Sequence, residues 1–134
     1  MVHGCRWNSP GRPVIYAAES YAGAMLEILV HANLAAPPRN QQVVGLAVPD
    51  DVAVETVVAT ALAGWDAEDV RATRAFGDRW LEERRTAVLR VPSVVTDGRE
   101  YNVLLNPVHE QFRRVMAAEP EPVRWDARLF GRTL

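Results

Sequence analysis

Prolines divide this chain into short segments, and this division constrains its fold more than any other feature of the sequence. Pro37 and Pro38 end the first long apolar run, and Pro49, Pro92 and Pro107 interrupt or end later β-branched runs. Proline lacks a backbone donor and clashes inside a helix, so it ends helices and is confined to strand edges or bulges. The chain therefore forms short helices and short strands joined by turns.

The segments between these prolines predict one strand and one helix, followed mostly by strands. The predicted elements, in chain order, are a strand over Pro13–Ala17, a helix over Tyr21–Asn33 capped by Ser20, a strand over Gln42–Val48, an ambiguous segment over Val52–Leu62 read as a strand and then a loop, an apolar plug at Trp65, a helix over Thr73–Arg85, strands over Ala87–Val95 and Tyr101–Leu105, a short helix from His109, and a segment, Val123–Leu129, that closes the sheet. This order predicts an α+β domain with a bent or split mixed sheet and flanking helices.

Length and composition limit the class of protein. The 134 residues suffice for one core without a metal or disulfide staple. The net charge of -2 gives no general attraction to nucleic acid, and all fifteen basic residues are arginines, which bind phosphate or carboxylate bidentately. Cys5 is the only cysteine, and no basic-then-apolar leader is seen. Both features predict a cytoplasmic protein.

Glu27 is the only formally charged side chain between Ala22 and Pro38. On a helix its neighbours three and four positions away are small or apolar, apart from His31, which is predicted to hydrogen-bond within the helix. An unpaired carboxylate in such surroundings costs stability, so either Glu27 pairs with an arginine at the edge of the core or it serves a function. The apolar run is too short and too polar to span a membrane.

Arg6 and Tyr16 precede this helix and flank the loop Trp7–Arg12. One strand–helix unit can bring a guanidinium, an aromatic ring and the Glu27 carboxylate to one cleft. A guanidinium binds phosphate, a ring packs on an aromatic leaving group, and a carboxylate stabilises positive charge on a ribose. These are the groups that a reaction through a glycosyl cation requires, although an ion pair of Glu27 with an arginine stays open.

Several segments occur here in the order found in the RES-domain toxin family: "GCRWNSPGRPVIYAAES", "AMLEILVH", "VPSVV", "YNVLLNPVH" and "WDARL". The resemblance covers nearly the whole chain. It implies a fold similar to that of the ADP-ribosyltransferases and consumption of NAD+ by the toxin half of a toxin–antitoxin pair. The partner that it implies is an Xre-family antitoxin.

The resemblance also implies which residues act. The family's catalytic arginine, in a GGRWNS-like motif, falls on Arg6; its tyrosine, ten residues on, falls on Tyr16; and its glutamate, eleven beyond that, falls on Glu27. Arg6, Tyr16, Ser93 and Asn8 are expected to contact NAD+. Members of the family usually carry a further strand and loop before this motif, so we expect a single RES domain over residues 1–134 that is short at its N-terminus.

Three further polar residues are predicted to have structural roles. Asn102 and Asn106 are expected to bond turn backbone, and His109 to cap or pack a helix. The three histidines and one cysteine lack the spacing of a zinc site, and no Rossmann or P-loop glycine motif is present. We expect no metal, and no cofactor beyond NAD+ as the substrate.

The resemblance leaves three functions open. The first is cleavage of NAD+ at the nicotinamide–ribose bond, with water or phosphate as the acceptor. The second is ADP-ribosyl transfer to a host protein, and the third is an inactive module that only binds its antitoxin. No direct contact with nucleic acid or membrane is expected, while a homodimer and a hetero-oligomer with the antitoxin both stay open.

Overall fold

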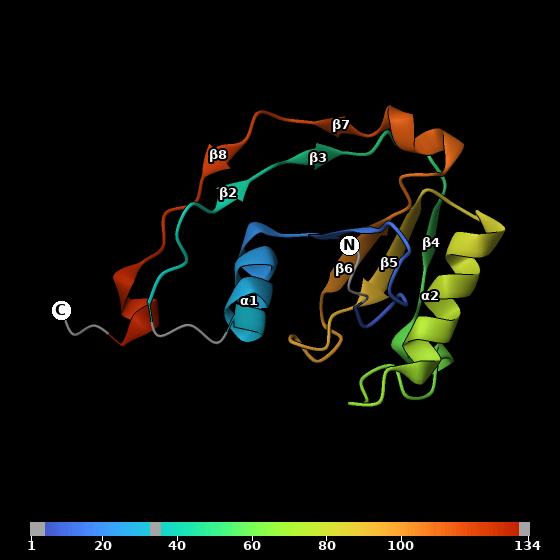
Figure 1. Ribbon diagram of the computed structural model, residues 1–134, viewed down its shortest axis with the longest axis horizontal. Helices are drawn as coiled ribbons and strands as arrows, with labels where there is room; N and C mark the ends of the chain where they lie inside the picture. Colours follow the sequence, from blue (N-terminus) through green and yellow to red (C-terminus); the bar gives the residue numbers. More distant parts are fainter. Residues whose placement is uncertain (1–4, 33–35, 132–134) are drawn as a thin grey trace.

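A four-stranded mixed sheet forms the centre of the structure, a computed structural model that describes residues 5–32 and 36–131 (Figure 1). Its strands lie in the order β1 (Ile15–Ala18), β6 (Tyr101–Leu105), β5 (Val88–Pro92) and β4 (Val54–Thr56). β6 is antiparallel to both of its neighbours, whereas β4 and β5 are parallel. Parallel neighbours need a crossover connection, which helix α2 (Arg71–Glu83) supplies. The predicted α+β class with a mixed sheet is confirmed.

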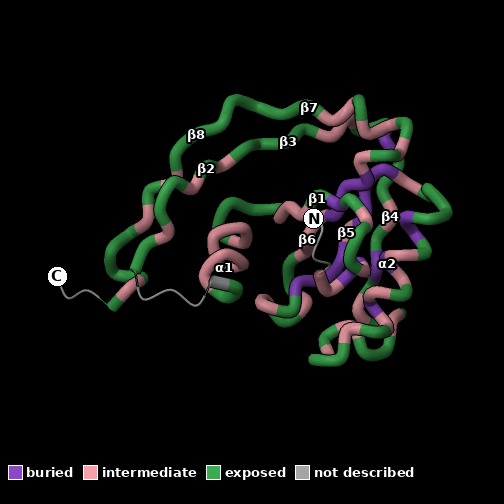
Figure 2. Tube along the Cα trace, in the orientation of Figure 1, coloured by how far each residue is buried: buried purple, intermediate pink, exposed green. Residues whose placement is uncertain are grey.

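The core lies on both faces of this sheet, because successive residues of β5 and β6 point to opposite sides. Leu89 and Leu104 pair across the strands and pack in a cluster with Trp80 of α2. Val88 and Leu105 pair next to them and belong to a second cluster. Figure 2 shows the buried residues concentrated along the sheet and α2.

Helix α1 (Tyr21–Ala32) follows β1 directly and lies towards the β1 edge of the sheet, whereas α2 lies beside β4 (Figure 1). The Ser20 hydroxyl accepts a hydrogen bond from the Gly23 N–H at 2.9 Å, so the predicted cap is confirmed. The predicted last residue, Asn33, lies outside the described residues. The helix is only partly covered, since 55% of Val30 is exposed.

Most of the remaining boundaries agree with the sequence to within two residues. β4 is followed by the 3-10 helix η1 (Ala59–Ala61), which confirms a strand and then a loop in this segment. α2 begins two residues before the predicted start, because the Asp69 carboxylate accepts the Arg71 N–H at 3.0 Å. It ends before Arg84, which adopts a left-handed φ of 49°.

Two predicted segments lie outside the four-stranded sheet. The Gln42–Val48 segment forms only β2 (Gln42–Val43) and β3 (Leu46–Ala47), which pair with β8 (Glu121–Pro122) and β7 (Met116–Ala117) in a separate arm. The Val123–Leu129 segment does not close the sheet and ends in the 3-10 helix η3 (Ala127–Phe130). The predicted strand over Gln42–Val48 is therefore confirmed in part, as two short strands. The prediction that Val123–Leu129 closes the sheet was wrong, because most of that segment is exposed to solvent and packs on no strand of the sheet. The arm extends past α1 in Figures 1 and 2.

Two structural roles are confirmed near the end of β6. The Asn106 Oδ1 accepts a hydrogen bond from the Val108 N–H at 3.1 Å within a turn. The His109 Nδ1 accepts one from the Gln111 N–H at 3.0 Å and caps the 3-10 helix η2 (Glu110–Arg114).

The segment Cys5–Ser9, here called the arginine loop, packs directly on the backbone of α2. A Cβ atom built on Gly77 would lie 1.6 Å from the carbonyl oxygen of Trp7. No side chain fits in that space, so the loop reaches its position only because residue 77 is glycine.

Hydrogen bonds from α2 hold the arginine loop on either side of Gly77. The Thr73 hydroxyl donates to the carbonyl of Arg6 at 2.5 Å. One turn later, the Asp78 carboxylate accepts the Ser9 N–H at 2.9 Å and also the Ser9 hydroxyl. Helix α2 therefore fixes the backbone of the arginine loop from Arg6 to Ser9.

Replacing Gly77 with alanine should separate the arginine loop from α2. Although alanine is the better helix former by about 1 kcal/mol, the clash with the Trp7 carbonyl should lower the free energy of unfolding by more than about 2 kcal/mol. Chemical denaturation measures this change. Ala75→Gly, at an exposed position in the same helix, is the control, and it should lower the free energy of unfolding only by the difference in helix propensity. A Gly77→Ala protein as stable as the wild type would contradict the contact.

Candidate active site

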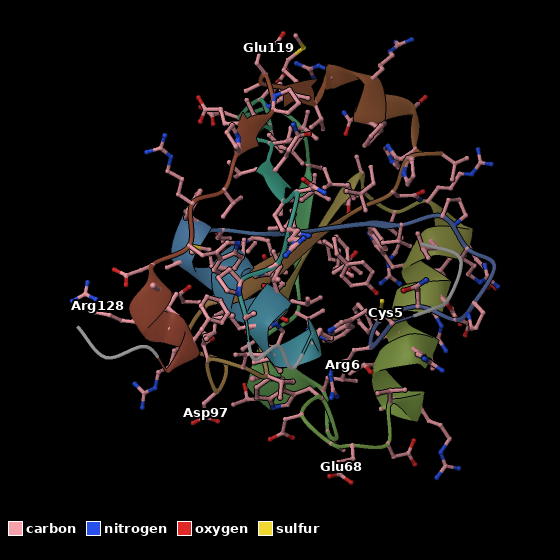
Figure 3. The ribbon with its side chains drawn as sticks, turned by 60° about the vertical axis from the view of Figure 1, so that its left-hand side comes forward. Cys5, Arg6, Glu68, Asp97, Glu119 and Arg128 are labelled. Carbon is pink, nitrogen blue, oxygen red and sulfur yellow. The ribbon has the colours of Figure 1, made fainter. Side chains whose placement is uncertain are left out.

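A cavity of about 540 Å³ lies between α1, the sheet and the arginine loop. Its lining is mostly apolar and includes Ile28, Val91 and Val95. The polar side chains on the lining include those of Arg6, Tyr16, Glu27, His31 and Asn102. Figure 3 shows Arg6 between α1 and α2. The structure therefore brings the three predicted catalytic residues to one cavity.

Strand register explains why Tyr16 and Asn102 reach this cavity together. Tyr16 lies opposite Leu104 in the β1–β6 pair, and Ala18 lies opposite Asn102. Because side chains alternate along a strand, Tyr16 and Asn102 project from the same face of the sheet. Helix α1 follows β1 after a short turn and brings Glu27 to this face.

The Glu27 carboxylate is held by neutral donors from two strand ends. Its Oε1 accepts hydrogen bonds from the Asn102 side-chain amide at 2.9 Å and from the Ser93 hydroxyl at 3.2 Å. Its Oε2 lies 3.5 Å from His31 Nδ1. Among the residues that the structure describes, no arginine pairs with Glu27, so the interpretation of an arginine ion pair was wrong.

Ser93 and Asn102 orient the carboxylate rather than compensate its charge. Ser93 follows β5 and is 3% exposed, and its backbone N–H donates to the Glu100 carbonyl at 2.9 Å. The expected structural role of Asn102 was wrong, because its amide bonds Glu27 and not turn backbone. The alternation along Tyr101–Leu105 was the available signal, since it places residue 102 on the same face as Leu104.

Two of the expected NAD+ contacts have other partners in the structure. The buried Asn8 accepts the Tyr16 hydroxyl at 2.5 Å and the Cys5 N–H at 3.2 Å, and its amide donates to the Ser9 carbonyl at 3.2 Å. The Ser93 hydroxyl bonds Glu27. Both residues therefore position a neighbour, and a direct contact of either with NAD+ stays a prediction.

Tyr16 presents its ring to the cavity while its hydroxyl points to Asn8. Burial raises the pKa of Tyr16 above the ordinary value of 10.0. The phenol therefore stays protonated at neutral pH and is unsuited to act as a base, whereas its ring can pack on a flat ligand.

The Arg6 guanidinium is held at one nitrogen. Its Nη1 donates to the carbonyl of Ala67 at 2.7 Å and to that of Trp65 at 3.3 Å. Within the described ranges, no carboxylate forms an ion pair with it. A positive group that is oriented but not neutralised, on the wall of a cavity, suits an anionic ligand. Sequence reasoning did not identify these carbonyls, because any residue can supply one.

His31 lies at the outer end of the cavity. Its side chain is 74% exposed, and its Nδ1 lies 2.8 Å from the Glu27 carbonyl oxygen, which confirms the predicted hydrogen bond within the helix. In the part of the chain that the structure covers, no cluster of three or more histidine, cysteine, aspartate or glutamate side chains is placed to bind a metal. No described helix is long and apolar enough to cross a membrane.

The fold and the cavity together define an α+β protein with a carboxylate and a guanidinium on the wall of one mostly apolar cavity. Neutral side chains hold the carboxylate, and backbone carbonyls orient the guanidinium. The chain belongs to the RES domain family, whose model matches residues 2–126. It is 39% identical over 132 residues to a Prs ADP-ribosylating toxin of a Sphingobium species, with 96% of this chain and 81% of that protein covered. It is 36% identical to a toxin Res of Pseudomonas putida, with 93% and 85% covered, and 31% identical to one of Yersinia enterocolitica, with 95% and 84% covered. The resemblance inferred from the motifs is confirmed.

Replacing Glu27 with glutamine should separate a catalytic role from a structural one. The glutamine oxygen can accept from both Asn102 and Ser93, so the melting temperature should hold or rise, while turnover should fall by roughly a hundredfold. Thermal melts and product formation are measured on the same preparation. Glu119→Gln, at an exposed position on the arm, should change neither. A less stable Glu27→Gln protein with normal turnover per folded molecule would end the catalytic assignment.

The buried Tyr16 phenol should make stability depend on alkaline pH. Because the folded state raises this pKa, the contribution of Tyr16 is fully present below about pH 10 and is lost as the pH rises towards the folded-state pKa. The free energy of unfolding should therefore fall more steeply above pH 10 in the wild type than in Tyr16→Phe. At pH 8 the variant should be less stable by about 1 kcal/mol, because Asn8 loses a donor. Parallel pH curves for the two proteins would refute this assignment.

Proposed function

We propose that this protein is a toxin that breaks the bond between nicotinamide and ribose in NAD+ and passes the ADP-ribosyl group to water or phosphate. The observation that carries the proposal is the Glu27 carboxylate, held in an apolar cavity by neutral donors and without an arginine partner among the described residues. Such a group costs stability unless positive charge develops beside it during a reaction.

Each group on the cavity wall has a defined part in this reaction. Arg6 binds a phosphate or ribose oxygen through the guanidinium nitrogens that the loop carbonyls leave unused. The Tyr16 ring packs on the nicotinamide. As the bond from the ribose carbon to nicotinamide breaks, its electron pair leaves with nicotinamide, and Glu27 stabilises the positive charge on the ribose. The acceptor oxygen then bonds to that carbon and, in the case of water, releases a proton.

A second function is ADP-ribosyl transfer to a protein, which shares the first bond cleavage. The relative that is 39% identical is named for ADP-ribosylation, and this observation favours the alternative. The cavity also reaches the surface beside His31 and Val30, where a large acceptor has access. An inactive module is less consistent with the site, because a protein interface does not require a carboxylate in an apolar cavity.

The proposal includes a partner and a location. The names of the relatives describe them as toxins, and the resemblance of the motifs is to toxins paired with Xre-family antitoxins. We infer that an antitoxin of this class restrains the protein in the cytoplasm. Its occupation of the cavity would block access to Arg6 and Glu27.

Incubation of the purified protein with NAD+, followed by mass spectrometry, should show free nicotinamide together with one ADP-ribosyl product. Free ADP-ribose supports hydrolysis, ADP-ribose 1-phosphate in phosphate buffer supports phosphorolysis, and an adduct formed with added cell lysate supports transfer to a protein. Glu27→Gln is the matched negative control. Intact NAD+ under all three conditions, with a correctly folded protein, would refute the enzymatic proposal.

A further inference from the structure

The carbonyl groups that hold Arg6 belong to one tight loop, Leu62–Ala67, here called the tryptophan loop. The Trp65 N–H donates to the Leu62 carbonyl at 3.3 Å, and the Ala67 N–H donates to the Gly64 carbonyl at 3.2 Å. Gly64 adopts a φ of 82°, which favours glycine. Two consecutive turns thus direct the Trp65 and Ala67 carbonyls at the same Arg6 nitrogen.

The Trp65 ring joins this loop to a second turn on the other side of the site. A Cβ atom built on Gly98 would lie 3.0 Å from Cη2 and 3.3 Å from Cζ2 of the Trp65 ring. The ring therefore lies flush against a glycine whose φ is 73°. Only glycine allows both this backbone conformation and this contact.

The turn under the ring begins at the residue that orients Glu27. The Gly98 N–H donates to the Ser93 carbonyl at 2.8 Å, and the Thr96 N–H lies 3.4 Å from the Ser93 hydroxyl. That hydroxyl in turn donates to Glu27. A chain of contacts therefore runs from Arg6 through Trp65 and Gly98 to Ser93 and Glu27.

We propose that Trp65 is a positioning residue that sets the place of the Arg6 guanidinium relative to the Glu27 carboxylate. The tryptophan loop bonds Arg6, and its ring is anchored on the turn that carries Ser93. This role deepens the NAD+-cleaving function and rests on it. Trp65 neither lines the cavity nor belongs to the two described core clusters, so its packing serves the link between the two turns rather than the core.

Loss of the ring has a consequence that simple destabilisation does not share. Without its anchor the tryptophan loop moves away from Gly98, and the carbonyl groups no longer restrain Arg6. Binding through Arg6 then weakens, so the KM for NAD+ rises. A purely structural defect lowers the fraction of folded protein, which reduces the apparent kcat but leaves KM unchanged.

The link itself is tested without any reaction. In the wild-type protein, the hydrogen bonds that Nη1 donates should restrict rotation of the Arg6 guanidinium, so that Nη1 and Nη2 give separate NMR signals. These signals are assigned to Arg6 by their absence from the spectrum of Arg6→Lys. Trp65→Ala should merge the two signals, whereas Trp125→Ala, which removes a ring from the edge-on contact with Phe130, should not. Separate Arg6 signals in Trp65→Ala would overturn the proposal.

Steady-state kinetics with NAD+ then test the consequence. Trp65→Ala should lower kcat/KM by about tenfold or more, the scale of a small misplacement of a binding group, with a raised KM and a melting temperature close to that of Trp125→Ala. An unchanged KM in Trp65→Ala would overturn the positioning role while leaving NAD+ cleavage intact. A different outcome would separate the two proposals. If the wild-type protein leaves NAD+ intact while Trp65→Ala still merges the Arg6 signals, the proposed function is refuted and the structural link is kept.

Discussion

The contact between the Trp7 carbonyl and the bare backbone of Gly77 is the constraint on which the rest of the site depends. It lets the arginine loop lie against α2, where Thr73 and Asp78 complete its hydrogen bonds. A buried backbone group must be paired, so a loop of this kind has few other stable positions. Arg6 lies in a loop, but the contacts of this loop with the packed helix α2 fix its position.

The cavity separates opposite charges that would otherwise neutralise each other. Glu27 is held by Ser93 and Asn102, and Arg6 is held by two backbone carbonyls. The carboxylate therefore keeps an acceptor, and the guanidinium keeps donors, for a ligand in the apolar cavity. A direct ion pair would satisfy both groups and leave neither available to a ligand. Holding each charge with neutral partners costs some stability, and this cost is typical of a site arranged for a charged substrate or transition state.

The parts of the fold that were predictable from sequence are those with local signals. The Ser20 cap, the strands β5 and β6 and the helix α2 each follow from a few neighbouring residues. The pairing of the Gln42–Val48 segment was not predictable, because β-branched residues favour a strand but do not specify which strand it pairs with. Pairing with β7 and β8 depends on residues about seventy to eighty positions away, which no local pattern reports.

By itself, the sequence determined the α+β class and the family, and it predicted that Arg6, Tyr16 and Glu27 meet at one cavity, because short motifs and periodicity are properties of neighbouring residues. Only the tertiary structure decided what surrounds them. It brought Asn102 into a hydrogen bond with Glu27 and Asn8 into one with Tyr16. It also directed the carbonyls of the tryptophan loop at the Arg6 guanidinium. These partners are distant in the chain or belong to the backbone. A backbone carbonyl has the same chemistry in every residue, so its role becomes visible only when folding brings it to a particular side chain.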